Sequence, residues 1–288
     1  MTSIETDVAV APQAPEPAAS ASRTPYVTVT PLGFWDRYHK PILGIIGVVA
    51  FIGLWQLVSS LRWLDPVYIS SPIRVVQAIP AVFGDDNFVH HIGVSGKEFG
   101  IGMLLVIVTG IPGGLLLGWY RPLRELTDPL ISALYSTPIV ALVPMLVLMF
   151  GIGIESKIAM VYLLAIWPVV INTTVGIRTI EPELIRMSRS FGAKNPRVFR
   201  TVALPASVPH IIVGLKNGVS RGIIAVVVAE LYGATAGVGY YLSSTGQIFE
   251  TDRYYFAVVF LALVGVVLMA ILSVIENLFS KWKVDSES

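Results

Sequence analysis

Charged and amide side chains inside long apolar runs are the residues of this sequence best suited to chemistry. The clearest case is Arg221, near the middle of an apolar run over residues 208–231. An ionised side chain at the centre of a bilayer costs about 3 kcal/mol, so it normally faces a cavity or a partner. A guanidinium in a cavity can bind an anion through paired hydrogen bonds. The alternative is a structural ion pair or hydrogen bond between helices.

Three further polar residues of the apolar runs are grouped with Arg221 as candidates for the pathway of an anionic solute. They are Asn172, Asn217 and Glu230. The structural alternatives are hydrogen bonding between helices for Asn172 and capping or pairing for Glu230. Pro138 and Pro144 interrupt another apolar run, where each removes a backbone hydrogen bond and bends the helix. These bends are interpreted either as the hinge of a gate or as packing features.

The motifs of common enzymes are absent from the sequence. It contains no glycine-rich nucleotide loop ending in Lys-Ser or Lys-Thr, so the chain is not expected to hydrolyse ATP itself. It has no Gly-x-Ser-x-Gly elbow, no cysteine, and no histidine pair with the helical spacing of a metal site. The adjacent His90 and His91 are assigned to a loop. We therefore expect no catalytic residue, no metal site and no cofactor bound by this chain.

Composition places the elements that carry these residues in a membrane. The 288 residues are 54% hydrophobic and 14% charged, which is too apolar for a soluble domain. A net charge of +1 argues against nucleic acid as a partner. Apolar runs of about 20 residues are the length that a bilayer requires. The sequence predicts an all-α polytopic membrane protein with six transmembrane helices, over residues 41–60, 93–120, 129–154, 157–177, 208–231 and 253–279.

The segments between these runs differ in composition. Residues 1–30 are rich in Ala, Pro, Ser and Thr and are predicted to be a disordered tail, whereas residues 31–288 form the membrane domain. Residues 73–83 suit a short surface helix, and residues 233–252 read as a glycine-punctuated loop. Residues 181–205 are the only long polar, basic passage between two spans.

This polar passage predicts two short amphipathic helices that meet at Gly192. Pro182 suits a first helical position, Gly192 suits a left-handed helix end, and Asn195 with Pro196 restarts the pattern. Such a hairpin cannot enter lipid and is expected to lie at the membrane surface, on headgroups or against another protein. Most basic residues outside the spans lie on the same side as this hairpin, which predicts that the hairpin and both termini are cytoplasmic.

The hairpin resembles the cytoplasmic loop of binding-protein-dependent ABC importer permeases. The signature of that family is Glu-Ala-Ala, three residues, Gly, nine residues, then Ile-x-Leu-Pro. Here Gly192 is followed by nine residues and then by Val202-Ala203-Leu204-Pro205, whereas Arg186-Met187-Ser188 stands at the Glu-Ala-Ala positions. Further similarity to the nitrate, sulfonate, taurine and bicarbonate branch lies in Thr137-Pro138, Ile171-Asn172-Thr173, Ser220-Arg221, Val228-Ala229-Glu230 and Gly237-Val238-Gly239-Tyr240.

The resemblance implies the fold of a type I ABC importer permease, working by alternating access in the cell inner membrane. It implies a homodimer of permease chains surrounded by membrane lipid, two cytoplasmic ABC ATPase subunits that bind ATP and Mg²⁺, and an extracytoplasmic solute-binding protein. In this family the loop forms coupling helices that dock on the ATPase. The residues assigned to that role here are Glu183, Arg186, Met187, Ser188, Phe191, Gly192, Ala193, Leu204 and Pro205.

Three other functions remain open at this point. A uniporter or channel would need no ATPase, and a membrane-embedded enzyme would need catalytic residues that the sequence does not display. The basic face of the hairpin could also serve mainly to bind anionic lipid, since each lysine or arginine near an acidic membrane gains about 1 kcal/mol. Lipid binding, however, does not require a fixed spacing from the glycine to Leu-Pro.

Overall fold

The computed structural model describes residues 34–61, 63, 65, 67–84 and 87–280. The chain divides into two units, Met1–Ala50 and Phe51–Ser288. The predicted disordered tail, residues 1–30, lies outside the described residues. In the first unit, the described residues 34–50 belong to a helix that ends at Ser60 in the second unit.

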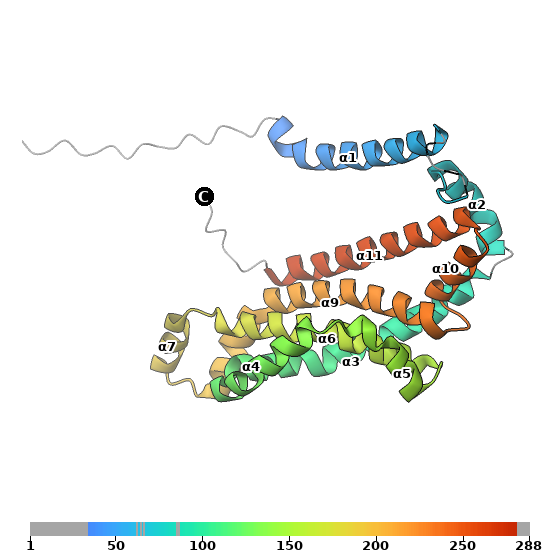
Figure 1. Cartoon of the computed structure of the whole chain (residues 1–288). Helices are drawn as coiled ribbons and strands as arrows, with labels where there is room; N and C mark the ends of the chain where they lie inside the picture. Colours follow the sequence, from blue (N-terminus) through green and yellow to red (C-terminus); the bar gives the residue numbers. More distant parts are fainter. Residues whose placement is uncertain (1–33, 62, 64, 66, 85–86, 281–288) are drawn as a thin grey trace, which may run out of the picture. The chain divides into compact units, whose positions relative to one another are not determined.

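The regular secondary structure of the described residues is entirely helical, as predicted. In chain order the elements of Figure 1 are α1 (Phe34–Ser60), α2 (Pro72–Gly84), α3 (Phe88–Trp119), α4 (Arg121–Ser136), the 3₁₀ helix η1 (Ile139–Leu142), α5 (Val143–Phe150), α6 (Ile154–Arg178), α7 (Pro182–Ser190), α8 (Asn195–Val198), the π-helix η2 (Phe199–Ala203), α9 (Leu204–Gly233), α10 (Val238–Gln247) and α11 (Thr251–Ser280).

Five of the described helices are long and apolar enough to cross a membrane. Their apolar stretches are Ile42–Ser60, Phe88–Trp119, Ile154–Arg178, Asn195–Gly233 and Thr251–Phe279. A sixth span results if α4 and the helices after it count as one bent span. Counted in this way the spans match the predicted six, and their bounds differ from the prediction mainly at three places.

The third span is broken rather than kinked. Instead of one bent helix over 129–154, Arg121–Ser136 and Ile139–Phe150 meet at an angle of 77°. Pro138 lies at the break, because it cannot donate the backbone hydrogen bond that would continue α4. Pro144 does not bend a helix. It lies in the first turn of α5, where its missing N–H would have had no partner within the helix.

The second helix of the predicted hairpin is not a separate element. Asn195–Gly233 is one continuous helical stretch, in which the π-helix η2 joins α8 to α9. Leu204 and Pro205 therefore lie in the first turn of α9 and do not end a hairpin. Proline is tolerated there because the π-type bonds of η2 already rearrange the backbone pairing.

Two segments assigned to loops contain helix. The glycine-punctuated passage 233–252 contains α10, and His90 and His91 lie in the first turn of α3. Gly233 and Gly237 flank a short turn, and such glycines are typical of loops. They obscured the helical pattern that begins at Val238 in the sequence. The helix predicted over 73–83 is confirmed as α2, in which Val75 and Val82 are buried.

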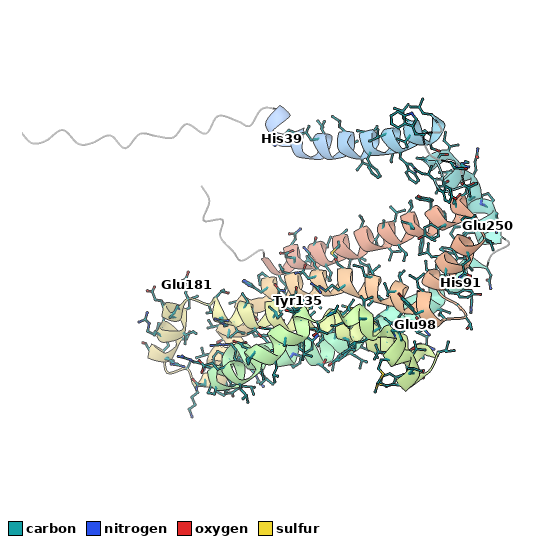
Figure 2. All side chains as sticks on the ribbon, viewed as in Figure 1. His39, His91, Glu98, Tyr135, Glu181 and Glu250 are labelled. Atoms are coloured by element: carbon teal, nitrogen blue, oxygen red, sulfur yellow. The ribbon has the colours of Figure 1, made fainter. Side chains whose placement is uncertain are left out.

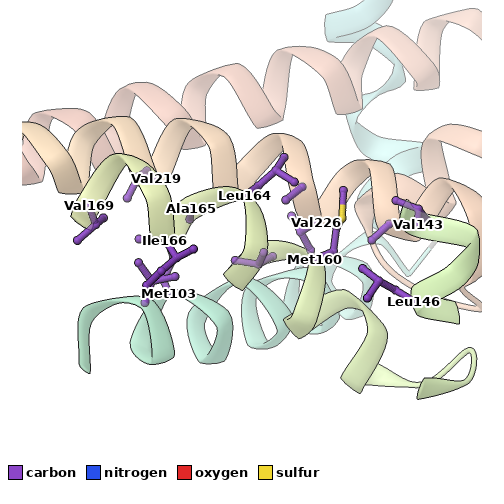
Figure 3. Close-up of a cluster of buried hydrophobic side chains, with 14 of the residues drawn as sticks. Met103, Val143, Leu146, Met160, Leu164, Ala165, Ile166, Val169, Val219 and Val226 are labelled. Carbon is purple, nitrogen blue, oxygen red and sulfur yellow. The ribbon is translucent and has the colours of Figure 1, made fainter. Parts of the chain in front are cut away.

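The main core of the second unit lies where α3, α6 and α9 run side by side, with α7 at one end of this bundle and α5 and α10 at the other (Figure 1). Figure 3 shows its buried apolar side chains, which include Met103 on α3, Val169 on α6 and Val219 on α9. Glycines on α3 face α6 directly: Gly102 lies against Val161, Gly114 against Thr173 and Gly118 against Ile177. Small residues at a helix contact let backbones approach closely in lipid, where water does not drive association.

A second apolar core lies at the end of the bundle that carries α10. Phe88 is fully buried and makes edge-to-face contacts with Tyr241, Phe256 and Phe260, at ring-centroid distances of 4.9, 5.4 and 5.3 Å. Such aromatic pairs contribute about 0.5–1.5 kcal/mol each beyond the area they bury. The start of α3 is thereby joined to α10 and α11.

Gly114→Ala is expected to destabilise the protein, whereas Gly113→Ala is its matched control. A Cβ at residue 114 would lie 2.6 Å from Thr173 Cβ and 2.8 Å from the backbone oxygen of Val170, and a Cβ at residue 113 would meet nothing within 4 Å. Overpacking of this kind costs about 1–3 kcal/mol. Thermal denaturation of the purified protein in detergent should show a lower midpoint for the first variant only. Equal midpoints would contradict the close contact of α3 with α6.

Candidate functional site

A polar cavity of about 300 Å³ lies between α4, α6 and α9. Its lining residues are Tyr135, Pro168, Ile171, Asn172, Asn217, Ser220 and Arg221. Three of the four residues predicted for a solute pathway, Asn172, Asn217 and Arg221, thus come together. The cavity combines a guanidinium, two amides and two hydroxyls with the apolar surfaces of a proline and an isoleucine.

Helical spacing on α9 explains how its residues reach this cavity. Asn217, Ser220 and Arg221 are three and four residues apart, so they share one face of the helix. Gly214 and Gly218 adjoin these residues on the helix surface, and their added Cβ atoms would lie 3.2 Å from Pro168 O and 3.3 Å from Ala165 O. The glycines let α9 lie close against α6, which brings the polar face beside Asn172.

Arg221 has no described carboxylate within ion-pair distance. Its Nη2 donates a hydrogen bond of 2.9 Å to the hydroxyl of Tyr135, and its Cζ lies 4.7 Å from the centroid of the same ring. Of the two structural alternatives, an ion pair is absent among the described residues, whereas a hydrogen bond between helices, from Arg221 of α9 to Tyr135 of α4, is present. A guanidinium has five N–H donors, and a neutral phenol uses one of them. The cavity consequently presents a cation with unused donors, which suits an anionic ligand.

Glu230 does not belong to this cavity. Its side chain is 1% exposed, and its two oxygens accept hydrogen bonds from Ser95 Oγ and from the backbone N–H of Gly239, each at 2.6 Å. Ser95 in turn accepts a hydrogen bond of 2.7 Å from the backbone N–H of Val238. The structure thus separates Glu230 from the other predicted pathway residues and places it in the anchor of α10.

The glycines after Glu230 make this anchor possible. Gly237 has a φ of +119°, a conformation that L side chains rarely adopt, and a Cβ at this residue would overlap the carboxylate of Glu230. The backbone N–H of Gly237 also donates to Nδ1 of His91 at 3.0 Å. The two sequence motifs at residues 228–230 and 237–240 therefore form a single structural unit.

Sequence reasoning missed three charged or polar residues near this anchor. Lys157, placed in an outside segment by the sequence, is 1% exposed, and its Nζ donates to the backbone oxygens of Ile152 and Gly233. Glu98, 4% exposed, lies beside Glu230 and has a buried oxygen without a hydrogen-bond partner among the described residues. The available signal for Ser95 and Glu98 was their separation by three residues, which puts both on one face of α3.

Tyr135 was also missed, although it is a lone tyrosine in the apolar run before Pro138. Figure 2 shows it along the bundle between Glu181, near α7, and Glu98 with His91 at the opposite end. The Arg221 cavity and the Glu230 anchor are therefore different places in the fold.

Two of the predicted coupling residues, Met187 and Phe191, form an exposed apolar surface on α7 and at its end, whereas Leu204 and Pro205 lie in α9. Met187 and Phe191 are 59% and 86% exposed, and Leu184 is also exposed on the same face. Glu183 and Arg186 are exposed as well, whereas Ser188 is half-buried and donates to Leu184 O at 2.8 Å.

Gly192 ends α7 with a φ of +78°. The N–H of Gly192 donates to Arg189 O at 2.9 Å, and the N–H of Ala193 donates to Ser188 O at 3.2 Å. This pair of bonds is a Schellman motif, in which glycine is favoured because the left-handed conformation strains other residues. The predicted glycine helix end is confirmed, and it holds Phe191 exposed at the end of the helix.

Comparisons with known proteins match most of this chain. The sequence model of the family described as "Binding-protein-dependent transport system inner membrane component" matches residues 110–284. The putative aliphatic sulfonates transport permease protein SsuC of Escherichia coli (strain K12) is 32% identical, over 88% of this chain and 95% of the relative. The taurine transport system permease protein TauC of the same organism is 27% identical, over 86% and 92%.

Solved structures show the same fold. A chain of the MetNI methionine ABC transporter in inward-facing conformation, native crystal form, superposes with a TM-score of 0.61 at 17% identity. The similarity covers 69% of the present chain and 100% of that chain.

Glu230→Ala is expected to be strongly destabilising. It leaves the buried donors of Ser95 and Gly239 unsatisfied and removes a carboxylate near the buried ammonium of Lys157. A buried donor left without its acceptor costs about 1–3 kcal/mol. The exposed pair of Arg121 and Glu125, 2.6 Å apart, provides the control, because Glu125→Ala should leave the denaturation midpoint nearly unchanged. Similar denaturation midpoints for the two variants would contradict an anchoring role of Glu230.

Proposed function

Because the chain belongs to the family of binding-protein-dependent transport system inner membrane components and is the permease subunit of an ABC importer, we propose that its solute is a small organic oxyanion of the sulfonate class. The observation that carries this proposal is the Arg221 cavity, where a guanidinium without a described carboxylate partner lies beside two amides and two hydroxyls. Two of its relatives are named for taurine and for aliphatic sulfonates.

The mixed lining of the cavity supports an organic anion. An oxyanion can accept bidentate hydrogen bonds from the planar fork of Arg221. Asn172, Asn217 and Ser220 offer further donors, and Pro168 and Ile171 offer apolar surface for a short carbon chain. A cavity of about 300 Å³ lies at the lower end of the range for small-molecule sites.

The site calls for a second permease chain. Asn217 and Ser220 are exposed on α9, within a stretch of the chain that crosses the membrane. Polar side chains at this depth are stable against water or protein but are costly against hydrocarbon. A homodimer would turn this face of each copy toward a shared pathway, while α1 and α11 present apolar surface to membrane lipid.

The remaining partners follow from the proposed orientation in the cell inner membrane. The basic end of the bundle with α7 is cytoplasmic, as are both chain termini, by the distribution of lysine and arginine. There α7 meets the ATPase subunits, which bind ATP and Mg²⁺, whereas this chain has no nucleotide loop. The solute-binding protein docks at the opposite end, near α10 and the turn between α5 and α6.

The surface of α7 suits docking on an ATPase better than docking on lipid headgroups. Leu184, Met187 and Phe191 form an apolar face that fits a protein groove, following the helix-in-groove mode of recognition. Arg186 stands beside this face where the family signature has glutamate, so the contact here relies on apolar burial and on a different charge pairing. The break at Pro138 is the proposed hinge through which movement of the coupling helices reaches the gate.

Arg221→Ala should reduce uptake of ethanesulfonate about tenfold or more, because a hydrogen bond to a charged group contributes about 1.5–3 kcal/mol. Uptake by Arg221→Lys should be higher than that of Arg221→Ala and lower than that of the unmodified protein, since lysine keeps the charge but loses the planar fork of the guanidinium. The measurement is ATP-driven uptake by the complete importer in proteoliposomes. Normal uptake by the alanine variant, with assembly intact, would contradict the proposed site. Uptake by the permease chain alone would contradict dependence on an ATPase.

Gly192→Val should uncouple ATP hydrolysis from uptake, whereas Gly192→Asn should retain coupling. Space is not limiting, because a Cβ at residue 192 would meet nothing within 4 Å. Valine is strained in the left-handed conformation by about 1–2 kcal/mol, and asparagine adopts it more readily. The readout is the number of solutes imported per ATP hydrolysed. Equal ratios for both variants would contradict a role for the geometry of this helix end in coupling.

A further inference from the structure

We propose that the Tyr135 hydroxyl occupies the anion-binding position at Arg221 while no solute is bound. The oxyanion of the solute must then displace this hydroxyl in order to bind. This inference rests on the proposed function of the cavity and adds a residue that sets its affinity and selectivity. Tyr135 is a positioning residue in this scheme, because it acts on the solute through the guanidinium.

Two interactions join the side chains of Tyr135 and Arg221. The hydroxyl of Tyr135 accepts a hydrogen bond of 2.9 Å from Arg221 Nη2, and the face of its ring lies 4.7 Å from Arg221 Cζ. Among the described residues, Tyr135 is the only side chain that hydrogen-bonds the guanidinium. A cation that would otherwise be unpaired at membrane depth is thereby stabilised while the site is empty.

The phenol can hold this position but cannot compete well with an anion. A hydrogen bond between a charged donor and a neutral oxygen is weaker than one between two charged partners, and a phenol cannot match the bidentate geometry of an oxyanion. The exchange therefore favours a solute with a planar or tetrahedral oxyanion over a neutral solute. A neutral solute would have to break the contact of Tyr135 with Arg221 without an equivalent replacement.

The position of Tyr135 in the chain connects this exchange to the broken span. Tyr135 lies in the last turn of α4, which ends at Ser136, and Pro138 follows at the bend of 77°. The backbone around it is lightly held, since Thr137 N–H donates to Leu134 O at 3.3 Å and α4 contains no buried residue. Release of the Tyr135 side chain therefore removes a contact between α9 and the end of α4.

The absence of cysteine from the chain allows a direct test in the assembled importer. Ser220→Cys places one thiol in the cavity wall, where a small neutral maleimide can label it. Ethanesulfonate should protect this thiol, and protection should be lost when Arg221→Ala is added. Adding Tyr135→Phe keeps the ring but deletes the hydroxyl, so half-protection should occur at an ethanesulfonate concentration about tenfold lower.

The matched control is Tyr162→Phe. Its hydroxyl accepts a hydrogen bond of 3.3 Å from Thr109 Oγ1, between α3 and α6 and outside the cavity, so its loss should leave the protection midpoint unchanged. Co-purification with the ATPase subunit establishes that each variant assembles.

The possible outcomes separate this inference from the proposed function. A midpoint that is unchanged or higher in the Tyr135→Phe background would overturn the inference, because the hydroxyl would then be irrelevant or a ligand of the solute. A lower protection midpoint in both the Tyr135→Phe and the Tyr162→Phe variants would also overturn the inference, since the effect would not be specific to the Arg221 cavity. Absence of protection in every background would contradict the solute site itself.

Discussion

The close approach of α3 and α9 to α6 is the constraint on which the rest of this structure depends. Hydrocarbon provides no hydrophobic drive for helix association, so the bundle relies on van der Waals contact over short distances. Glycines supply these distances on both sides of α6: Gly114 of α3 lies against Thr173, and Gly218 of α9 lies against Val169. On α9, Asn217 and Arg221 follow Gly214 and Gly218 by three residues each, so they border the contact with α6, and the cavity forms at the edge of that contact.

Two groups of polar residues serve different purposes along the same bundle. Near α10, the carboxylate of Glu230 has hydrogen-bond partners on two elements and holds a glycine turn against the end of α9. Between the ends, Arg221 has a single neutral partner and unused donors. A buried polar group with its hydrogen bonds satisfied stabilises a fold, whereas one with spare donors is available to a ligand. This distinction, rather than charge alone, separates an anchor from a site.

The apolar surface of α7 adds a third feature that the chain by itself does not bury. Its exposed Met187 and Phe191 are held outward by a helix end that glycine makes possible, and α7 packs only lightly on the bundle. Exposed apolar side chains on a basic amphipathic helix mark a contact with another protein. The permease fold thus joins a packed membrane bundle to a helix with an exposed apolar face.

The sequence alone determined the class of the protein, the number of spans, the position of α7 and the helix end at Gly192. These features depend on composition and local backbone preference, which act over a few residues. It also singled out Arg221, Asn172 and Asn217, because polar groups in apolar runs are conspicuous. Only the tertiary structure separated Glu230 from them, broke the span at Pro138, and revealed Tyr135, Lys157 and Glu98 as neighbours of the important groups. The physical reason is that a partner 86 or 135 residues away in the chain is set by the packing of helices, which no local pattern encodes.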